Sequence, residues 1–142
     1  MEQTATQDIP PSKRPLPVPH SNRDYDFFYQ GLEAGKLLVQ KCDGCGTVRN
    51  PPGPMCPHCH SLKWTPIECR GTGTVYSYTV HYHPPLPNFD SPHAIVLADM
   101  SEGFRLIGGL QGARPEDIRI GMPLVVGFER RGEVSTFHFR LA

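Results

Sequence analysis

The sequence predicts a mainly β fold built from short strands. The 142 residues include 16 prolines and 14 glycines, which is more than average usage, and both residue types interrupt long helices. Short runs rich in Val, Ile, Tyr, Phe and Thr alternate with Gly or Pro clusters over the second half of the chain. Two CxxC pairs precede these runs and indicate a metal-binding module of their own.

The bulk composition narrows the function classes. Lys+Arg and Asp+Glu both number 14, which argues against a polyanion as the main partner but leaves room for a local basic patch. No apolar run approaches the roughly 20 residues that a membrane span requires, and Met1 to Pro19 lacks the apolar core of a signal peptide. We therefore expect a cytoplasmic protein with no membrane partner, in which clustered cysteines are metal ligands rather than disulfides.

The chain divides into a leader over residues 1–23, a helix with a cysteine-rich module over 24–70, and a β domain over 71–142. The leader is expected to be disordered, because closely spaced prolines favour polyproline II and prevent a continuous helix. These prolines are Pro10, Pro11, Pro15, Pro17 and Pro19. A tail that lies on a partner is the alternative to a solvated leader.

A short helix is predicted over 24–34. Asp24 is a suitable N-cap, Asp26 lies near the positive end of the helix dipole, and Gly35 is a suitable C-terminal stop. Gly31 weakens the helix interior, so the helix needs a surface to pack against. Apolar side chains recur on one face at helical spacing, namely Tyr25, Phe28, Tyr29 and Leu32.

This helix and one loop are the predicted partner contacts. A small core has little room for several adjacent aromatic residues on so short a helix, so these residues are expected in an interface with a partner. Burial on the chain's own domain is the alternative. The loop over 83–92 is stiffened by prolines, and a stiff loop with apolar tips loses little entropy on binding; a plain hairpin connection is the alternative. The predicted anchors are Phe27, Phe28 and Leu32 on the helix, and Leu86 and Phe89 on the loop.

The strongest pattern in the sequence is its cysteine spacing. Cys42 and Cys45 form one CxxC pair, Cys56 and Cys59 form another, and ten residues separate the pairs. A CxxC turn directs two sulfurs to one point, and Zn²⁺ prefers four such ligands in a tetrahedron. The sequence therefore predicts a zinc ribbon with one structural zinc ion per chain, because four cysteines leave no open position for catalysis.

Two alternatives accompany the zinc prediction. One is a redox-active CxxC pair, which the closeness of the two pairs disfavours. The other is replacement of one cysteine ligand by His58 or His60. Cys69 falls outside the pattern and is expected to be an ordinary small side chain, and a strand over 37–40 leads into the first pair.

The β domain follows as short runs of strand formers. A single helical turn is predicted over 114–121, and Gly121-Met122-Pro123 then turns the chain sharply. Five strands with one break of this kind suit a small closed barrel such as the OB-fold. The predicted strands are 73–82, 94–100, 104–110, 124–130 and 134–141.

No catalytic residue is predicted. The sequence contains no GxSxG elbow, no P-loop and no Rossmann fingerprint. Histidines on or beside the predicted strands are expected to be structural, and these are His81, His83, His93 and His138. Without a nucleophile and base set, the chain alone is not expected to catalyse a reaction.

An aromatic helix, a four-cysteine ribbon and a five-stranded barrel in this order resemble the DUF35 family of OB-fold zinc-ribbon proteins associated with acyl-CoA. The likeness covers about residues 24–141, and the barrel motifs make it more specific than the cysteines alone. The matching stretches are FFYQGLEAG (27–35), LLVQKCDGCGTVRNP (37–51), CPHC (56–59), GTGTVYSYT (71–79), IRIGMPLV (118–125) and FHF (137–139).

The resemblance implies an accessory subunit of a thiolase-like enzyme of the sterol-carrier-protein-thiolase kind. Such pairs make or break C–C bonds of acyl-CoA substrates, as thiolases or retro-aldolases, in bacterial degradation of steroids, aromatic acids or fatty acids. Other members accompany acyl-CoA hydratases. It further implies a hetero-oligomer with acyl-CoA at the interface, and it carries over only the four zinc ligands.

Two other functions are weighed against this one. Zinc ribbons and OB-folds also bind single-stranded nucleic acid, and the aromatic residues that could stack on bases are Tyr76, Tyr78, Tyr82 and Phe104. The neutral net charge disfavours this function. A stand-alone acyl-CoA-binding protein would use basic residues for the CoA phosphates, and the candidates are Arg70, Arg105, Arg119, Arg130 and Arg131.

Overall fold

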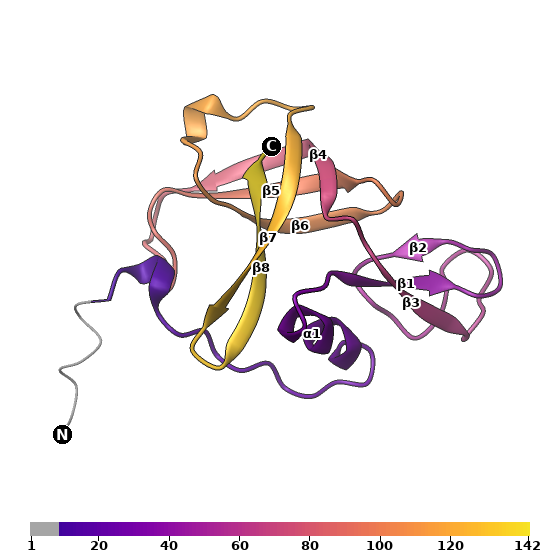
Figure 1. The fold of residues 1–142 in the computed structure, drawn as a ribbon. Helices are drawn as coiled ribbons and strands as arrows, with labels where there is room; N and C mark the ends of the chain where they lie inside the picture. The colour runs from indigo at the N-terminus through magenta and orange to yellow at the C-terminus, as the bar shows by residue number, and fades with distance from the viewer. Residues whose placement is uncertain (1–8) are drawn as a thin grey trace, which may run out of the picture.

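The computed structural model describes residues 9–142, and Figure 1 shows a small three-stranded sheet beside a β-barrel. None of the described helices is long and apolar enough to cross a membrane. The elements are η1 (Pro11–Lys13), α1 (Asp26–Glu33), β1 (Leu38–Cys42), β2 (Val48–Arg49), β3 (Trp64–Glu68), β4 (Thr72–His81), β5 (His93–Met100), β6 (Arg105–Leu110), η2 (Pro115–Asp117), β7 (Pro123–Arg131) and β8 (Val134–Leu141).

The second sheet is a closed five-stranded barrel in the order β4-β5-β6-β8-β7, which confirms the predicted fold class. Hairpins join β4 to β5, β5 to β6 and β7 to β8 as antiparallel neighbours. A parallel contact between Leu110 and Phe139 joins β6 to β8, and residues 72–74 of β4 close the barrel against β7. The barrel therefore closes through two short contacts between its hairpins.

Strict alternation along β5 builds part of the barrel core. On β5 the side chains of Ala94, Val96, Ala98 and Met100 point inward and are buried, whereas their neighbours face outward. Phe139 of β8 is fully buried in the same core. Ile118, which directly follows η2, is also fully buried and joins this cluster, so the single turn predicted over 114–121 helps to fill the barrel.

The ribbon sheet has the strand order β2-β1-β3, and the sequence predicted only β1 of these three strands. β2 has two residues, which is too short for any periodicity to show. β3 contains Pro66, which argues against a strand in the sequence but is tolerated here because β3 is an edge strand.

Helix α1 begins at Asp26, so the prediction of Asp24 as the N-cap is wrong. The carboxylate of Asp26 accepts hydrogen bonds from the backbone N–H of Asn22 (2.9 Å) and the hydroxyl of Ser21 (2.8 Å). These bonds lower the pKa of Asp26, with the Asn22 N–H as the larger cause. Gly35 has a φ of 70° directly after the helix, as a C-terminal stop requires.

The helix lies between the ribbon and the barrel and contacts both. The ring of Phe28 meets that of Phe137 on β8 edge-on at 6.2 Å, and the ring of Phe27 lies 4.8 Å from that of Trp64 on β3. Gly31 allows the helix to approach β1, because a Cβ at this position would lie 2.8 Å from Cγ of Leu38. The glycine that weakens the helix in isolation is therefore required by its packing.

The leader differs from the sequence expectation where the structure describes it. Residues 1–8 lie outside the described part, but residues 9–23 run along the barrel and include η1. The buried guanidinium of Arg131 donates to the backbone oxygens of Arg14 (3.0 Å) and Pro11 (2.9 Å). Backbone carbonyls need no apolar side chains to bind, so a proline-rich segment with no buried residue can still be positioned.

Candidate metal centre and binding surfaces

The four cysteines of the two CxxC pairs come together at one end of the ribbon. Their sulfur atoms all lie within 4.8 Å of one another, and all four are free thiols. Cys42 and Cys59 approach to 3.5 Å, and Cys45 and Cys56 approach to 3.6 Å. A tetrahedral zinc ion with four thiolates would set such distances at about 3.8 Å, so the four cysteines are positioned to bind one metal ion.

Two turns of the same kind present these sulfurs. In the first, Gly46 N–H donates to the Cys42 carbonyl (2.9 Å), and in the second, His60 N–H donates to the Cys56 carbonyl (3.0 Å). Gly46 and His60 both have positive φ, 78° and 62°. His60 thus occupies the backbone position that glycine fills in the first turn, which explains its place in the sequence without a metal-binding role.

Backbone donors at the turns favour the thiolate form of some ligands. The N–H of Cys45 is the main cause that lowers the pKa of Cys42 to about 6. The hydroxyl of Thr47 likewise lowers the pKa of Cys45. The N–H of Ser61 donates to Cys59, but neighbouring thiols and burial outweigh it and raise the pKa of Cys59 to about 11. A metal cation at the centre favours the thiolate at every position.

The fifth cysteine lies apart from this cluster. Cys69 is buried where β3 leads into β4, and burial is the main cause that raises the pKa of its thiol to about 12. Glu102 lies beside it and accepts a hydrogen bond from the Arg70 N–H (3.1 Å). A buried, protonated thiol agrees with the ordinary small side chain expected from the sequence.

A groove of ≈ 620 Å³ lies between the leader, the segment before β5 and the outer side of β5, β6 and β8. Two glycines open its floor, since a Cβ on Gly108 or Gly109 would collide with Phe137 or His93. Its polar lining residues include Lys13, His93, Gln111, Glu129, Arg131 and His138. Gln111 and Lys13 both turn toward the carboxylate of Glu129, at 3.1 and 3.8 Å.

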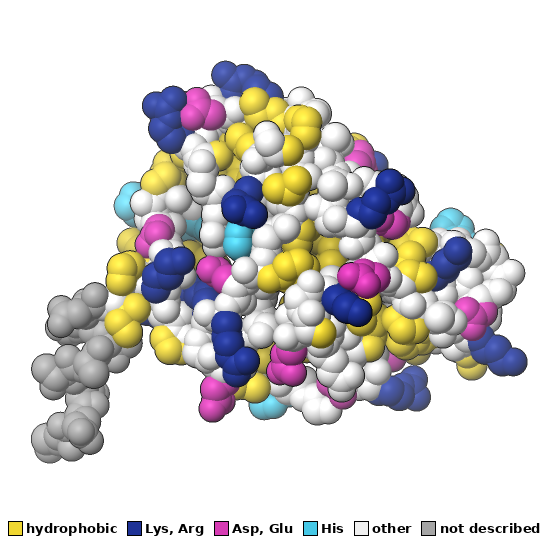
Figure 2. Space-filling view, in the orientation of Figure 1, with side chains coloured by type: hydrophobic (Ala, Val, Ile, Leu, Met, Phe, Trp, Pro, Cys, Tyr) yellow, Lys and Arg dark blue, Asp and Glu magenta, His cyan; other side chains and the backbone are white. Residues whose placement is uncertain are grey.

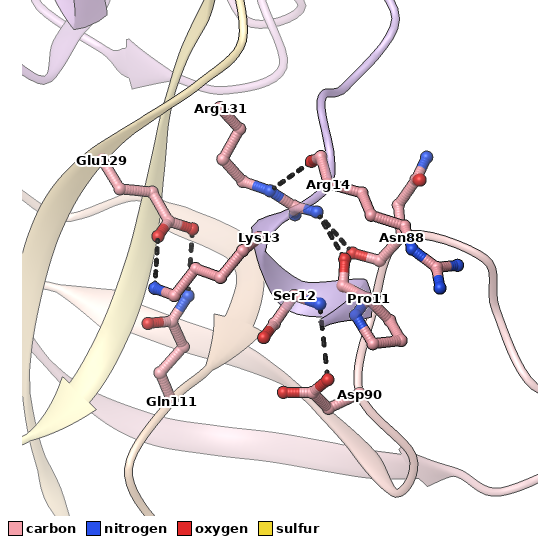
Figure 3. Close-up of polar contacts among 9 residues, drawn as sticks. All are labelled: Pro11, Ser12, Lys13, Arg14, Asn88, Asp90, Gln111, Glu129 and Arg131. Atoms are coloured by element: carbon pink, nitrogen blue, oxygen red, sulfur yellow. Dashed lines mark hydrogen bonds and ion pairs between the residues drawn. The ribbon is translucent and has the colours of Figure 1, made fainter. Parts of the chain in front are cut away.

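Arg131 forms the centre of the polar contacts around the groove, as Figure 3 shows. Its side chain is 4% exposed, and besides the two leader carbonyls it donates to the Asn88 carbonyl at 2.6 Å. One arginine thus fixes both the leader and the loop over 83–92. This role could not be predicted from the sequence, since an Arg-Arg-Gly turn between two strands usually places its charges in solvent.

Within residues 9–142, neither histidine of the groove forms an ion pair with an acid. Burial is the main cause that lowers the pKa of both His93 and His138. The ring of His93 stacks on that of Phe89 at 4.4 Å. Nδ1 of His138 is buried and has no hydrogen-bond partner within residues 9–142. Both rings are therefore neutral packing groups near neutral pH.

The predicted partner anchors differ in how deeply the structure buries them. Phe28 and Leu32 are 8% and 4% exposed, which corrects their assignment as anchors, because side chains buried under the helix have no surface to offer. Phe27 is half-buried on Trp64, and Leu86 and Phe89 are also half-buried. The Arg131 guanidinium lies 5.5 Å from the centre of the Phe89 ring.

Other apolar side chains are exposed instead. Figure 2 shows hydrophobic side chains gathered at the top of the molecule, over β4 and the segment with η2. The exposed large hydrophobic residues of the barrel region are Tyr76, Tyr78, Tyr82, Ile107, Ile120 and Phe128. Phe104, the fourth aromatic considered for base stacking, is 6% exposed and belongs to the core.

Two family models match the chain. The model described as "ChsH2, rubredoxin-like zinc ribbon domain" matches residues 30–65, and "ChsH2, C-terminal OB-fold domain" matches residues 67–129. These matches agree with the cysteine cluster and the closed barrel, and they identify the metal module as a zinc ribbon.

Two curated relatives differ in length. The chain is 45% identical over 121 residues to a probable enoyl-CoA hydratase alpha subunit of Thermomonospora curvata, covering 85% of this chain and 37% of that protein. It is 34% identical over 96 residues to a DUF35 domain-containing scaffold protein of Methanocaldococcus jannaschii, covering 66% of this chain and 68% of that protein. The chain therefore spans only about a third of the hydratase subunit.

One solved structure resembles most of the chain. A chain of the structure entitled "Ltp2-ChsH2(DUF35) aldolase" superposes with a TM-score of 0.82 at 42% sequence identity. The match covers 87% of this chain and 98% of that chain, so it includes both the ribbon and the barrel.

Proposed function

Because the chain belongs to the DUF35 family of zinc-ribbon and OB-fold proteins, we propose that it is an accessory subunit of a thiolase-like acyl-CoA enzyme. The partner chain would make or break C–C bonds of acyl-CoA substrates, as an aldolase or a thiolase. The observation that carries the proposal is the match to one chain of the Ltp2-ChsH2(DUF35) aldolase over 98% of that chain. At 42% identity, this likeness extends beyond the fold to the sequence.

The chemistry of the site supports a role without catalysis by this chain. Four cysteines fill the coordination sphere of a zinc ion, so the metal holds the ribbon together and offers no position for substrate. The groove residues Lys13, Gln111 and Glu129 contact one another, and the groove histidines are neutral packing groups. The acid, base and nucleophile would therefore come from the partner.

Docking and ligand contacts belong to the same proposal. Phe27, Leu86 and Phe89 keep partial exposure, which supports them as contacts of the partner. We place the acyl-CoA at the interface of the two chains and the complex in the cytoplasm. Nucleic acid is not a proposed ligand, since Phe104 is buried and the formal net charge is +0.

A hydratase partner is the second candidate. The 45% identity to the hydratase alpha subunit favours it, although the matched part is only 37% of that protein. The two candidates differ in the product. An aldolase or thiolase partner shortens the acyl chain, whereas a hydratase adds water and keeps every carbon.

The proposal is tested by co-expression with a thiolase-like chain encoded beside this one. We expect the two chains to elute as one complex in size-exclusion chromatography. Mass spectrometry should find a shortened acyl-CoA with the complex and none with this chain alone. Turnover by the isolated chain would overturn the accessory role. Water addition by a complex with a hydratase chain, together with no binding to the thiolase-like chain, would establish the second candidate.

A further inference from the structure

The interior of the ribbon contains a buried arginine with no acidic partner. Arg49 of β2 is 9% exposed, and its guanidinium forms no ion pair with any described residue. The ribbon has only two acidic residues, and both are exposed and bound elsewhere. Asp43 accepts from the Thr65 hydroxyl (2.8 Å), and Glu68 pairs with Lys36 (3.7 Å). Because a buried charge is costly unless it is compensated, a negative group other than these carboxylates must lie near Arg49.

The groups in contact with Arg49 supply more hydrogen-bond donors than acceptors. Oε1 of Gln40 accepts from Nε of Arg49 and from the N–H of Gly53, both at 2.9 Å, and the Gly53 carbonyl accepts from Nη2 of Arg49 at 3.2 Å. Within residues 9–142, Nη1 of Arg49 and Nε2 of Gln40 are buried without a hydrogen-bond partner. Two spare donors on a buried cation and its amide partner leave this part of the interior electrically positive.

This positive cluster lies beside the cysteine site. Gln40 and Cys42 are two residues apart on β1, so their side chains lie on the same face, about 7 Å apart along the strand. Arg49 is directly opposite Gln40 on β2, and the bond between their side chains places the guanidinium on that face as well. Arg49 and Cys42 are both buried, and charges in the interior are screened much less than charges in water.

The cysteine site carries negative charge when it holds zinc. Ligating cysteines are thiolates, so four of them around one Zn²⁺ leave a net charge of about −2. Lys41 and Lys63 flank the cysteine turns in the sequence, but both are exposed to solvent and salt. Among the cations of the ribbon, Arg49 is the one that is buried on the face of the ligands.

We propose that Arg49 is the counter-ion of the zinc centre and that Gln40 positions its guanidinium. The buried cation offsets part of the negative charge of the four thiolates and thereby raises the affinity of the ribbon for zinc. The centre in turn supplies the negative charge that Arg49 lacks among the described side chains. Groups outside the ligands of a metal can change its affinity by about 10–100-fold. This role is independent of the partner enzyme and of its reaction.

The alternative is that Arg49 and Gln40 only hold the loop at Gly53, with an internal water on the spare donors. Gln40→Glu separates the two roles. A carboxylate at this position accepts both 2.9 Å bonds and removes the unsatisfied Nε2 donor, so a purely structural role predicts zinc binding at least as tight as in the wild type. A counter-ion role predicts weaker binding, because the new negative charge pairs with Arg49 and repels the thiolates.

The affinity for zinc is measured on the full chain by competition with a chelator of known zinc affinity, at fixed pH and ionic strength. Circular dichroism first establishes that each zinc-loaded variant is folded. We expect Gln40→Glu to weaken zinc binding on the order of tenfold or more. Lys41→Gln is the matched control, because it removes an exposed cation next to Cys42, and it should change the affinity less than about twofold. Zinc binding by Gln40→Glu that is as tight as in the wild type, or tighter, would overturn the inference and leave Arg49 as a structural clamp.

Two variants of Arg49 give a second test, which decides the question alone if Gln40→Glu does not fold. Arg49→Lys keeps the positive charge but loses the planar fork that bonds Gln40 and Gly53, whereas Arg49→Gln loses the charge. We expect Arg49→Lys to bind zinc several-fold more tightly than Arg49→Gln. Equal losses in the two variants, or a larger loss in Arg49→Lys, would overturn the counter-ion role, since the contacts and not the charge would then determine the affinity.

Discussion

The ribbon and the barrel lie side by side, but different interactions stabilise the interior of each. Ten large side chains of the described chain are fully buried, and the two regions contribute equally to them. The ribbon contributes Leu37, Val39, Gln40, Cys42 and Cys56, whereas the barrel contributes Val75, Val96, Ile118, Leu124 and Phe139. All five barrel residues are aliphatic or aromatic, but two ribbon residues are metal-ligand candidates and one is an amide.

The ribbon replaces apolar packing with directed polar contacts. Oε1 of the fully buried Gln40 accepts hydrogen bonds from Nε of Arg49 and the backbone N–H of Gly53, both at 2.9 Å. Arg49 also donates to the Gly53 carbonyl at 3.2 Å. These bonds hold the loop between the two cysteine turns, yet a module with so few apolar residues needs a metal to stay folded. The comparison teaches that the cysteine end of the ribbon depends on polar contacts and a metal, although the apolar ribbon residues Leu37 and Val39 join the same core cluster as the barrel.

The largest expected effect is loss of the metal. Replacing the buried ligand Cys56 by Ser should reduce the zinc content from about one ion per chain to a small fraction and unfold the ribbon, because metal binding and folding are coupled in such modules. Barrel amides should keep their protection in hydrogen exchange, because the barrel has its own apolar core. Zinc analysis and exchange measured on the same sample check both statements.

Cys69→Ser is the matched control for this change. Cys69 is buried like Cys56 but lies outside the cluster of four sulfurs. The zinc content of the Cys69→Ser variant should therefore equal that of the wild type. A wild-type ribbon that stays folded without zinc would contradict the claim that the ribbon depends on the metal for its stability.

A change in the barrel core should lower the stability of the barrel and leave the zinc content unchanged. Phe139→Ala removes a fully buried ring that contacts Phe137 at 5.9 Å, and it should lower the free energy of unfolding by about 3–5 kcal/mol while zinc stays bound. Phe128→Ala on the adjacent strand should cost less than about 1 kcal/mol, since Phe128 is 40% exposed. Urea denaturation followed by tyrosine and tryptophan fluorescence separates these outcomes. Equal losses in the two variants would show that the barrel is not held by its interior.

Local patterns in the sequence were sufficient for the barrel. Runs of strand-forming residues between Gly and Pro clusters reveal the five strands, and on β5 the residues Val96 and Ala98 also alternate with outward-facing neighbours. The cysteine spacing likewise revealed the metal site, because two CxxC turns constrain their own geometry. Each of these predictions depends on residues close together in the sequence.

Contacts between distant segments could not be predicted in this way. Whether Phe28 faces a partner or the barrel depends on the position of Phe137, which is more than a hundred residues away in the sequence. Arg131 binds the leader through backbone carbonyls, which leave no trace in the sequence. β3 was missed for a related reason, because Pro66 is tolerated only on an edge strand and the sequence does not reveal strand order.

Mutations can separate the contacts that helix α1 makes with the barrel from those that it makes with the ribbon. Phe28→Ala should lower the stability of the barrel by roughly 3 kcal/mol, because Phe28 is 8% exposed and packs on β8. Phe27→Ala should have a smaller effect, on the order of 1 kcal/mol, because Phe27 remains half-buried on the ring of Trp64. Thermal unfolding of both variants with zinc present gives the comparison, and a larger loss for Phe27→Ala would place the main support of the helix on the ribbon.

The smallest expected effect concerns the leader, which belongs to neither region and is attached by a few polar contacts, two of which come from the buried side chain of Arg131. Arg131→Gln removes the donors to the carbonyls of Pro11 and Arg14. Arg130→Gln is a matched control, because among residues 9–142 Arg130 donates only to the Gly132 carbonyl in the same turn. Global unfolding should change by less than about 1 kcal/mol in both variants, since the leader buries no residue in η1.

Local protection of the leader should nevertheless differ between these two variants. The bond between Lys13 and Arg14 is a trypsin site, and in Arg131→Gln we expect it to be cut several-fold faster than in Arg130→Gln or the wild type, because cleavage follows the population of the open leader. Equal cleavage rates in all three proteins would show that other contacts suffice, such as the Lys13–Glu129 pair at 3.8 Å or the packing of Pro15 on Gly132. Faster cleavage with unchanged zinc content and melting temperature would show that the leader opens without disturbing the ribbon or the barrel. The local stability of the leader would then depend on the buried side chain of Arg131.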